Sequence, residues 1–459
     1  MRLFAPEDPR PVHFVGIAGA GMSALALMAR RRGVAVTGCD TNLEGAADVA
    51  RAGAGVSVGH DPSHVVGARA VVYTAAVPAE HPELAAARAA GIPVVRRAAA
   101  LGEVVAGGTV VAIAGTHGKT TTTVMVTDAL AAAGLDPTGL AGGRVAGWNG
   151  NARIGGDRLF VVEADEYDRS FLELSPTVAV VNNVEADHLE CYGSLEHLEA
   201  AFVAFAGRAA RLLVGSDDAG ALRVGGAVGE PIWRVGFAAK ADLRVTDLAQ
   251  RPDHTHARLT LPDGRSVELR LRVPGVHNVR NAAMAVGVAA ALEAPLEPVL
   301  AALARFGGVG RRFEQVGEAR GVVVVDDYAH HPTEVAATLA AARQRFPEAR
   351  LVAVFQPHLY SRTASHGDAL GIALALADLV VVTDVYAARE RPLPGVSGER
   401  VAEAARRAGA TVVWAPGREA LAGRVAEEVR AGDVVITLGA GDITGVGREL
   451  LARLRGEAA

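Results

Sequence analysis

The stretch VVAIAGTHGKTTTTVMV, residues Val110–Val126, has the pattern of a strand, a glycine-containing turn and a helix. A phosphate-binding loop reads G-x-x-x-x-G-K-[ST], and the G-K-T at 118–120 matches its end. Ile113 occupies the position of the first glycine, and a glycine occurs instead at Gly115. We therefore interpret the stretch as a nucleotide triphosphate site, with backbone amides facing the phosphates.

The use of lysine in this chain supports that interpretation. Of the 46 Lys and Arg residues, only Lys119 and Lys240 are lysines. A compact ammonium fits between phosphate oxygens under a tight backbone turn, whereas a planar guanidinium does not. The lysine of the loop is therefore predicted to contact the phosphates.

Length and composition limit the class of protein. At about 150 residues per domain, 459 residues predict about three domains. The net charge of -5 gives no electrostatic footprint for nucleic acid or an anionic membrane. The N-terminus lacks a signal-peptide pattern, and no apolar run is long enough for a membrane helix. Two cysteines, Cys39 and Cys191, fit a reducing compartment, so we expect a cytoplasmic protein with no membrane insertion.

Apolar runs that alternate with helical stretches predict an α/β fold. The strand candidates are continuous and rich in Val and Ile, which is typical of parallel sheets covered on both faces. The pattern restarts at about residues 12, 110 and 321. Hinges are expected at Gly107-Gly108 and in residues 305–314, which predicts domains 1–107, 108–310 and 311–459. Alternating residues around Asp263-Gly264 predict an antiparallel hairpin attached to the middle domain.

A second glycine loop lies near the N-terminus, in VHFVGIAGAGMSALA. Gly19, Gly21 and Ala24 have the spacing of a dinucleotide fingerprint, and Asp40 follows at the end of the next strand candidate. Such a turn suits the pyrophosphate of any nucleotide diphosphate, not only NAD. A tight strand-to-helix turn without a ligand is the alternative.

Polar residues after the next strands fit a triphosphate and its metal ion. Thr120 is expected to ligate Mg²⁺, and Glu163 follows a strand where a carboxylate can hold that ion. Asp187-His188 ends another strand, at the edge where parallel sheets bind ligands, although a lone histidine is more often structural. Asn278 and Asn281 open a helix, as simple N-caps or as adenine contacts.

The last third of the chain contains three polar clusters, each directly after an apolar strand candidate. The sequences DDYAHHPTE and FQPHLYSR contain residues that could bind zinc: Asp326, Asp327, His330, His331 and His358. No pair of them has i, i+4 spacing on a helix, which makes zinc the weaker interpretation. Arg362 instead suits recognition of a carboxylate or a phosphate.

Taken in order, these motifs resemble the Mur ligase family. The matching strings include GTHGKTTTT, EADEYDRSF, NVEADHLECYG, PGVHNVRNA, DDYAHHPTE, FQPHLYSRT and GAGDI. The resemblance extends from Gly16 to Ile443, and several strings are most similar to the branch that adds L-alanine to UDP-N-acetylmuramate. It implies a Rossmann-like N-terminal domain, a central P-loop-type ATPase domain and a Rossmann-like C-terminal domain. The cofactors implied are ATP and Mg²⁺.

The resemblance also implies roles for particular residues. UDP-sugar contacts are implied for Gly19, Ala20, Gly21, Met22, Ser23 and Asp40. ATP contacts are implied for Gly115, Thr116, His117, Gly118, Lys119, Thr120, Thr121, Asn281 and Arg312. Metal ligation is implied for Thr120, Glu163 and His188, and amino-acid or phosphate contacts for His358 and Arg362. Catalytic roles are implied for Lys119, His188, His330 and Arg312, with His188 and His330 both candidates to accept the amine proton.

Two positions depart from the family pattern. Several relatives carry a lysine that is carbamylated in use about fifteen residues after the position of His188, but this chain has Phe202 there, so no carbamylated ligand is expected. Leu359 replaces an arginine common in its motif, which leaves one substrate contact without an assigned residue.

The expected reaction is ATP-dependent ligation of L-alanine to the lactyl carboxylate of UDP-N-acetylmuramate through an acyl phosphate, by a monomer or weak homodimer with no nucleic-acid partner. Three alternatives stay open on the sequence. A related ligase could attach a preformed peptide to the same nucleotide sugar. A nicotinamide-dependent oxidoreductase would use Gly19, Gly21 and Asp40 but gives the ATP loop no role. A non-catalytic UDP-sugar sensor is the third.

Overall fold

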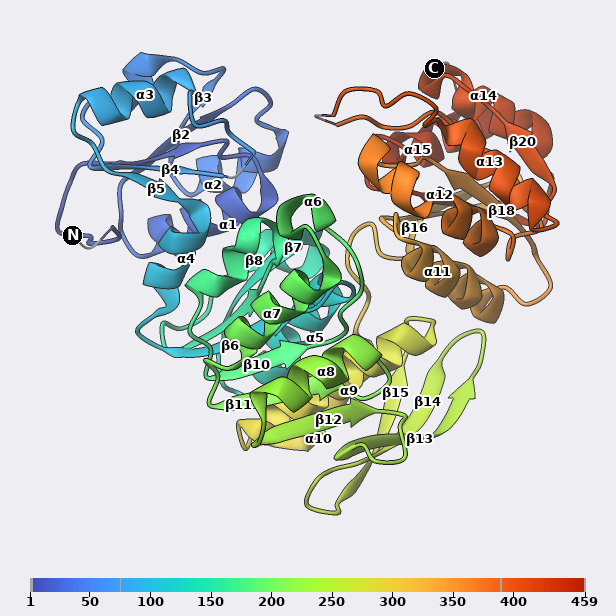
Figure 1. Ribbon diagram of the computed structural model, residues 1–459, viewed down its shortest axis with the longest axis horizontal. Helices are drawn as coiled ribbons and strands as arrows, with labels where there is room; N and C mark the ends of the chain where they lie inside the picture. The colour runs from blue at the N-terminus through green and yellow to red at the C-terminus, as the bar shows by residue number, and fades with distance from the viewer. Residues whose placement is uncertain (1–2, 75, 389, 458–459) are drawn as a thin grey trace. The chain divides into compact units, whose positions relative to one another are not determined.

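The computed structural model describes residues 3–74, 76–388 and 390–457, which form three sheets flanked by helices (Figure 1). The chain divides into two compact units. The first comprises Met1–Asp247, Ala257–Leu269 and Arg280–Arg305, and the second comprises Leu248–His256, Arg270–Val279 and Phe306–Ala459. The five-stranded sheet lies in the first unit, and the six-stranded sheet lies in the second. The ten-stranded sheet lies in the first unit except for parts of its last three strands in sequence. The three-domain division at 107/108 and 310/311 stays a prediction.

The N-terminal sheet has five parallel strands in the order β3-β2-β1-β4-β5. Its central strand β1 is buried along its whole length. The chain turns to β2 on one side of β1 and to β4 on the other, which makes the carboxyl end of β1 a switch point where such sheets bind ligands. The strands are β1 (Val12–Val15), β2 (Val36–Asp40), β3 (Gly55–Val58), β4 (Ala70–Tyr73) and β5 (Val94–Arg96). The helices are α1 (Ala20–Arg31), α2 (Ala47–Arg51), α3 (Pro82–Ala89) and α4 (Arg97–Val105).

The second sheet has ten strands in the order β15-β14-β13-β12-β11-β10-β6-β9-β7-β8. Strand β6 (Thr109–Ala114) lies between β10 (Val178–Val181) and β9 (Leu159–Glu163) and is parallel to both. The remaining strands are β7 (Thr138–Val145), β8 (Gly150–Arg153), β11 (Arg211–Gly215), β12 (Ile232–Gly236), β13 (Leu243–Gln250), β14 (Thr255–Thr260) and β15 (Ser266–Leu271). Neighbouring strands β14 and β15 are joined by a tight turn in which Gly264 N donates to Leu261 O, which confirms the predicted hairpin.

Helices accompany this sheet in the sequence: α5 (Lys119–Ala132), α6 (Leu189–Tyr192), α7 (Leu195–Ala206), α8 (Ala219–Val228), α9 (Val276–Ala291) and α10 (Leu296–Arg305). Short 3-10 helices are η1 (Glu44–Ala46), η2 (Pro62–Val65), η3 (Ala146–Trp148) and η4 (Tyr167–Glu173). Within the first unit, α1 packs against β7 and β8, and one hydrophobic core includes residues from both sheets, such as Phe14 of β1 and Phe160 of β9. The two glycine loops are therefore parts of one packed body.

The third sheet has the order β16-β17-β21-β18-β19-β20 and is parallel except for the β16–β17 pair. Its strands are β16 (Glu314–Ala319), β17 (Val322–Asp327), β18 (Arg350–Phe355), β19 (Leu379–Val382), β20 (Val412–Trp414) and β21 (Asp433–Leu438). Alternate residues of β18 enter two separate cores, one shared with α11 (Pro332–Arg345), α12 (Tyr360–Leu374) and α13 (Gly398–Arg407), the other with α14 (Arg418–Glu428) and α15 (Thr444–Arg455). Helices cover both faces, as in a doubly wound fold, and the predicted α/β class is confirmed.

The strand expected before the glycine turn at Gly115 forms β6, and its side chains are buried on both faces of the sheet. Among the described residues, no helix combines the length and the apolar character needed to cross a membrane.

Candidate active site

The loop that follows β6 is built on two glycines with positive φ angles. Gly115 has φ 137° and Gly118, the N-cap of α5, has φ 78°. A Cβ at Gly118 would lie 2.7 Å from Asn281 Oδ1, so only glycine fits there. The loop is braced from the end of β10, where Asn183 accepts hydrogen bonds from Thr116 N (3.0 Å) and His117 N (2.7 Å). These hydrogen bonds and the two glycines fix the backbone conformation of the turn.

Lys119 lies within this turn. Its Nζ donates to Gly115 O (2.8 Å) and to Glu166 Oε1 (2.8 Å), and Glu166 is buried. Burial opposes the charge, but the carboxylates of Glu166, Asp165 and Glu163 outweigh it and raise the pKa of Lys119 above its ordinary value. The loop therefore contains a fixed ammonium cation at its centre.

Thr120 and Glu163, the two predicted magnesium ligands, face each other. Thr120 Oγ1 donates to Glu163 Oε1 at 3.0 Å, and Glu163 Oε2 accepts from Gly142 N at 2.6 Å. A hydroxyl and a carboxylate are hard oxygen donors of the kind that Mg²⁺ prefers. The pair therefore fits the metal ion that the sequence predicted there.

His188 lies at the N-cap of α6 with φ 54°, beside two acidic side chains. Its Nε2 is 3.7 Å from Asp187 Oδ2, and its Nδ1 is 3.5 Å from Glu190 Oε1. Burial works against the charged ring, but Glu190, Asp187 and Glu166 raise the pKa of His188 above its ordinary value. The residue lies in an acidic setting, as expected of a site that binds cations.

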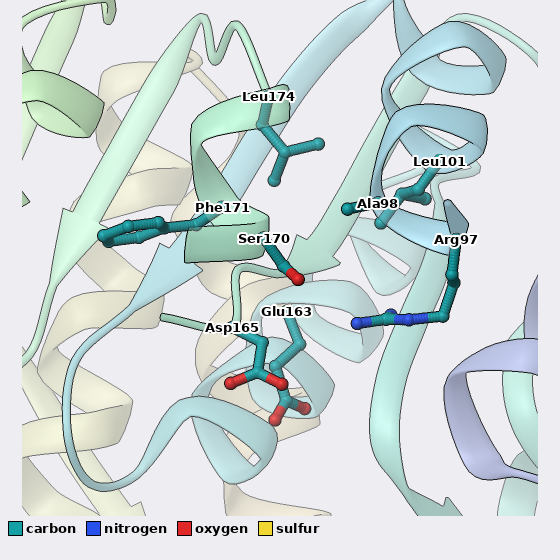
Figure 2. Close-up of a pocket in the computed structure, with 8 residues that line it drawn as sticks. All are labelled: Arg97, Ala98, Leu101, Glu163, Asp165, Ser170, Phe171 and Leu174. Atoms are coloured by element: carbon teal, nitrogen blue, oxygen red, sulfur yellow. The ribbon is translucent and has the colours of Figure 1, made fainter. Parts of the chain in front are cut away.

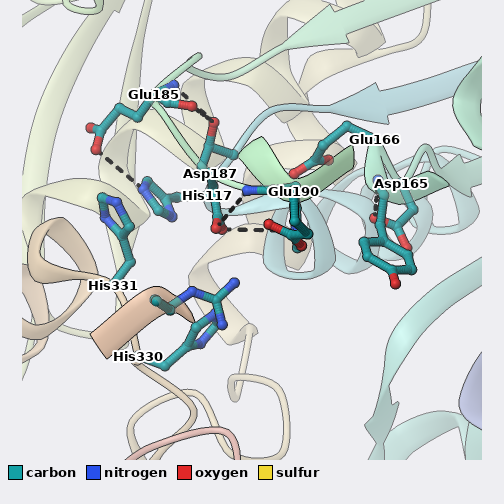
Figure 3. Close-up of polar contacts among 12 residues, drawn as sticks. His117, Asp165, Glu166, Glu185, Asp187, Glu190, His330 and His331 are labelled. Atoms are coloured by element: carbon teal, nitrogen blue, oxygen red, sulfur yellow. Dashed lines mark hydrogen bonds and ion pairs between the residues drawn. The ribbon is translucent and has the colours of Figure 1, made fainter. Parts of the chain in front are cut away.

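His117 is oriented by a residue from the loop after β10. Its Nε2 lies 3.5 Å from Glu185 Oε2, a pair that a dashed line marks in Figure 3. Glu185 N donates to Thr116 Oγ1 at 2.9 Å. Thr121 is buried in the first turn of α5. Of the predicted ATP residues, those from Gly115 to Thr121 and Asn281 therefore belong to one local structure.

The N-terminal glycine loop differs in its chemistry. Gly19 is the N-cap of α1, and Asp40 Oδ2 accepts a hydrogen bond from Ala18 N at 3.0 Å. Met22 and Ser23 are buried, and Ser23 Oγ donates to Ala20 O at 3.1 Å. Met22 and Ser23 can thus meet a ligand through their backbone rather than through their side chains.

A pocket within the first unit lies next to both loops. Figure 2 shows Arg97, at the start of α4, pointing toward Glu163 and Asp165. A Cβ at Gly21 would lie 2.7 Å from Arg97 Nη1, so the guanidinium also covers the N-terminal loop. The other lining residues are Ala98, Leu101, Ser170, Phe171 and Leu174. Arg97 is therefore a cation placed between the predicted UDP-sugar and ATP sites.

The second unit brings its four predicted site residues into one chain of contacts. Arg312 Nη1 lies 3.8 Å from Glu334 Oε1, and Glu334 Oε2 is 3.3 Å from His330 Nδ1. The ring of His330 contacts that of His358 with centroids 6.0 Å apart, and His358 Nδ1 is 3.2 Å from Arg362 Nη1. Two arginines and two histidines together suit an anionic ligand.

Zinc binding by the clusters of the third segment is not supported. Within residues 3–74, 76–388 and 390–457, the side chains Asp326, Asp327, His330, His331 and His358 do not gather as a metal-ligand group. Asp326 is hydrogen-bonded to Arg311 (3.0 Å) and Thr437 (2.6 Å), and Asp327 accepts the amides of Phe313 and Ala329. Both carboxylates therefore stabilise the segments that pack around β17 through hydrogen bonds.

Several site residues escaped the sequence interpretation. Glu166 was hidden as the third acid of EADEYD, and only the fold shows that it pairs with Lys119. Asn183 follows an apolar strand directly, which is a signal that could have indicated a loop brace. Arg97 had no signal, because one of 44 arginines is not distinguishable by type. Phe202 is buried against Phe171, with ring centroids 5.1 Å apart, so the position of the carbamylated lysine is filled by core.

Three family models match the chain: the Mur ligase family catalytic domain at residues 11–109, the Mur ligase middle domain at 113–289 and the Mur ligase glutamate ligase domain at 311–441. A UDP-N-acetylmuramate–L-alanine ligase of Kineococcus radiotolerans is 48% identical over 450 residues, covering 96% of this chain and 95% of that protein. The ligase of the same name from Mycolicibacterium vanbaalenii is 46% identical and covers 99% of this chain and 98% of that protein.

Solved structures agree with these matches. The UDP-N-acetylmuramate–alanine ligase of Thermotoga maritima has a TM-score of 0.83 and 30% identity, covering 97% of this chain and 99% of that chain. A murein peptide ligase from Psychrobacter arcticus has a TM-score of 0.72 and 26% identity, covering 98% of this chain and 100% of that chain.

Proposed function

The chain belongs to the Mur ligase family, and we propose that it joins L-alanine to the lactyl carboxylate of UDP-N-acetylmuramate at the expense of ATP, a step of peptidoglycan precursor synthesis. The single observation that carries the proposal is the largely buried Lys119 ammonium, with its side chain 14% exposed, inside a glycine turn in a chain with one other lysine. Full-length relatives that bear the name of this activity support the choice of substrates.

ATP binds, in this proposal, at the turn from Gly115 to Thr121. The amides at the start of α5 and the Lys119 ammonium meet the triphosphate, and Asn281 meets the adenine. Glu166 holds the ammonium while nucleotide is absent, and the phosphate oxygens replace that carboxylate when ATP enters. Arg312 is the residue of the second unit proposed to contact the nucleotide.

Magnesium fits beside this turn. Thr120 and Glu163 would hold the ion, and His188 would hold a second one. When bound, Mg²⁺ neutralises negative charge on the triphosphate and on the approaching carboxylate. The acids around His188 provide a setting that attracts cations even before nucleotide binds.

The nucleotide sugar binds at the N-terminal glycine loop. Gly19, Ala20 and Gly21 present backbone amides at the start of α1 to the diphosphate. Asp40 fixes this loop through Ala18 N, and Arg97 adds a positive charge next to Gly21. The lactyl carboxylate then extends toward the ATP loop within the first unit.

The proposed chemistry has two steps. A lactyl carboxylate oxygen attacks the γ-phosphorus of ATP, which forms an acyl phosphate and expels ADP. The L-alanine amine next attacks the acyl carbon, loses a proton, and expels inorganic phosphate. Positioning and charge neutralisation supply most of the catalysis in such transfers. His188 and His330 are the two candidates to accept the amine proton, and His358 and Arg362 are proposed to contact the amino acid or the phosphate.

One second candidate has support. The murein peptide ligase from Psychrobacter arcticus covers nearly the whole chain at 26% identity, so the incoming amine could belong to a preformed peptide. The higher identity of the L-alanine ligases favours the amino acid. The oxidoreductase alternative relied on Asp40, which instead accepts a hydrogen bond from the loop amide of Ala18.

Location and organisation complete the proposal. We place the protein in the cytoplasm, where ATP is available and Cys39 and Cys191 stay reduced. We propose residues 1–107 as the UDP-sugar domain, 108–310 as the ATP domain and 311–459 as the amino-acid domain. A monomer or weak homodimer is the expected assembly.

The test is phosphate release from ATP with UDP-N-acetylmuramate and a panel of amines. We expect release with L-alanine and only weak release with L-Ala-γ-D-Glu-diaminopimelate. Preference for the peptide would establish the second candidate. Absence of nucleotide-sugar-dependent release with every amine would overturn both.

A further inference from the structure

A cluster of histidines surrounds one buried carboxylate in the N-terminal sheet, on side chains that belong to neither glycine loop. Glu83 is 0% exposed, and Cys39 and His13 are 0% and 1% exposed. His64 is half-buried and completes a group whose ligand atoms all lie within 4.8 Å of one another. None of these side chains has a role in the proposed ligation.

The four groups are close enough to share one ion. Cys39 Sγ lies 3.6 Å from His13 Nε2 and 3.0 Å from Glu83 Oε2. His64 Nδ1 lies 2.8 Å from Glu83 Oε1, and His13 Nε2 lies 4.0 Å from Glu83 Oε2. Ligand atoms around a tetrahedral zinc ion are separated by about 3.3–3.6 Å, given bonds of roughly 2.0–2.3 Å. The observed separations fall on both sides of that range.

The fold holds these ligands on four different elements. His13 lies on β1, Cys39 on β2, His64 on η2 and Glu83 at the start of α3. The ring of His13 is oriented by Thr37 Oγ1, 2.9 Å from Nδ1, which leaves Nε2 directed at the group. A metal-bound histidine usually has such a hydrogen bond at its other ring nitrogen.

The centre of the group is a carboxylate that solvent does not reach. Glu83 Oε1 lies 3.1 Å from Cys39 Sγ, 3.0 Å from Asp61 N and 2.8 Å from His64 Nδ1. Buried carboxylates in proteins are paired or coordinate a metal, so a divalent cation at this place would compensate the charge of Glu83.

A further atom indicates that the network is incomplete as it stands. His81 Nδ1 is buried and has no hydrogen-bond partner among the described residues, and it lies 4.0 Å from Glu83 Oε2. His60 Nδ1 lies 3.5 Å from the same oxygen. Buried polar atoms normally have a partner. His81 belongs to a second possible ligand group with His60 and Glu83, so Glu83 is the carboxylate that both groups share.

We propose that His13, Cys39, His64 and Glu83 bind a structural zinc ion. One thiolate, two imidazoles and one carboxylate form a mixed set of four that suits tetrahedral Zn²⁺ and not the oxygen shell of Mg²⁺. Cys39 loses its thiol proton to solvent when the Zn–S bond forms. The ion ties β1, β2, η2 and α3 together next to Asp40, which follows Cys39 and anchors the glycine loop.

The first experiment measures metal content. The full-length chain, purified without a polyhistidine tag, is incubated with ZnCl₂, desalted and analysed for bound zinc in three forms: wild type, C39S and C191S. The second cysteine, Cys191, lies outside the group and serves as the matched control. We expect one zinc per chain in wild type and C191S and its loss in C39S. No retained zinc in wild type, or equal zinc in C39S, would overturn the proposal.

The second experiment does not depend on the folding of a variant. Cobalt(II) replaces zinc in the wild-type chain, and the visible and near-ultraviolet spectrum is recorded. A thiolate-to-cobalt charge-transfer band with tetrahedral d–d bands is the expected result. It should be unchanged by an excess of Mg²⁺-ATP, which occupies a different site. A spectrum of six-coordinate cobalt without the thiolate band would contradict the assignment.

Discussion

The two glycine loops of the first unit follow the same plan and differ in where they keep their positive charge. Each comes after a buried parallel strand, β1 or β6, and opens a helix, α1 or α5. The ATP loop contains its own cation, Lys119, held by Gly115 O and Glu166. The N-terminal loop contains none, and its nearest charges are the carboxylate of Asp40 and the guanidinium of Arg97 from α4.

This difference matches what the loops are proposed to bind. A triphosphate that undergoes phosphoryl transfer needs a cation fixed at the reacting end, whereas a diphosphate that only anchors a sugar can rely on helix amides. The comparison predicts that removal of Lys119 damages chemistry and that changes at the N-terminal loop damage only binding of the sugar nucleotide.

The largest effect is expected from Lys119→Ala. Loss of the only cation inside the ATP loop should lower kcat for phosphate release by roughly 100- to 1,000-fold, the scale of losing one preorganised charge donor. Steady-state phosphate release measures it. Lys240→Ala, at the exposed second lysine, is the matched control and should behave as wild type. Near-normal turnover in Lys119→Ala would break the comparison.

A smaller effect is expected from Arg97→Ala. The guanidinium next to Gly21 should contribute one charge-assisted contact, so KM for the nucleotide sugar should rise about tenfold while KM for ATP stays within error. Arg96→Ala is the control, since Arg96 pairs with Asp168 at 3.0 Å on the surface. An equal rise in both KM values would show that Arg97 does not discriminate between the loops.

The Glu166→Gln variant tests through thermal stability whether Glu166 is the partner of the Lys119 ammonium in the absence of nucleotide. The substitution leaves the Lys119 ammonium without its carboxylate, so Tm without nucleotide should fall by roughly 2–4 °C. ATP should raise Tm more in the variant than in wild type, because phosphate oxygens replace the lost partner. Thermal unfolding with and without ATP measures both values. An equal nucleotide effect in the two proteins would contradict the exchange of partners.

The smallest effect is expected from Asp40→Asn. The amide oxygen can still accept the hydrogen bond from Ala18 N but without a charge, so KM for the nucleotide sugar should rise about two- to threefold. Asp157→Asn, at the exposed end of an ion pair with Arg32, is the control. A change in nucleotide specificity toward NAD would instead favour a dinucleotide site.

The fold was predictable wherever local pattern decides it. Continuous apolar runs such as that of β6 can be satisfied only inside a covered parallel sheet, so their strands follow from the sequence. The order of strands and the packing of α1 on β7 depend on contacts between distant residues, which no local pattern contains.

The same division applies to the site. Gly118, Lys119 and Thr120 are adjacent in sequence and match the end of the phosphate-binding loop pattern, so the sequence alone predicts a phosphate site there. Glu166 and Arg97 act on that loop from other elements, so they become visible only in three dimensions. The group around Glu83 could not be predicted from the sequence for the same reason. Its members are spread from His13 to Glu83 and have no spacing typical of metal ligands.

The most direct test of the account follows one oxygen atom. UDP-N-acetylmuramate labelled with oxygen-18 in the lactyl carboxylate is incubated with ATP, Mg²⁺ and L-alanine, and the released phosphate is analysed by mass. If the carboxylate is phosphorylated at the ATP loop, one labelled oxygen from each labelled substrate molecule must leave with the phosphate. Phosphate free of label, with the lost carboxylate oxygen found in AMP or in water instead, would contradict the acyl phosphate and therefore the proposed roles of the two loops.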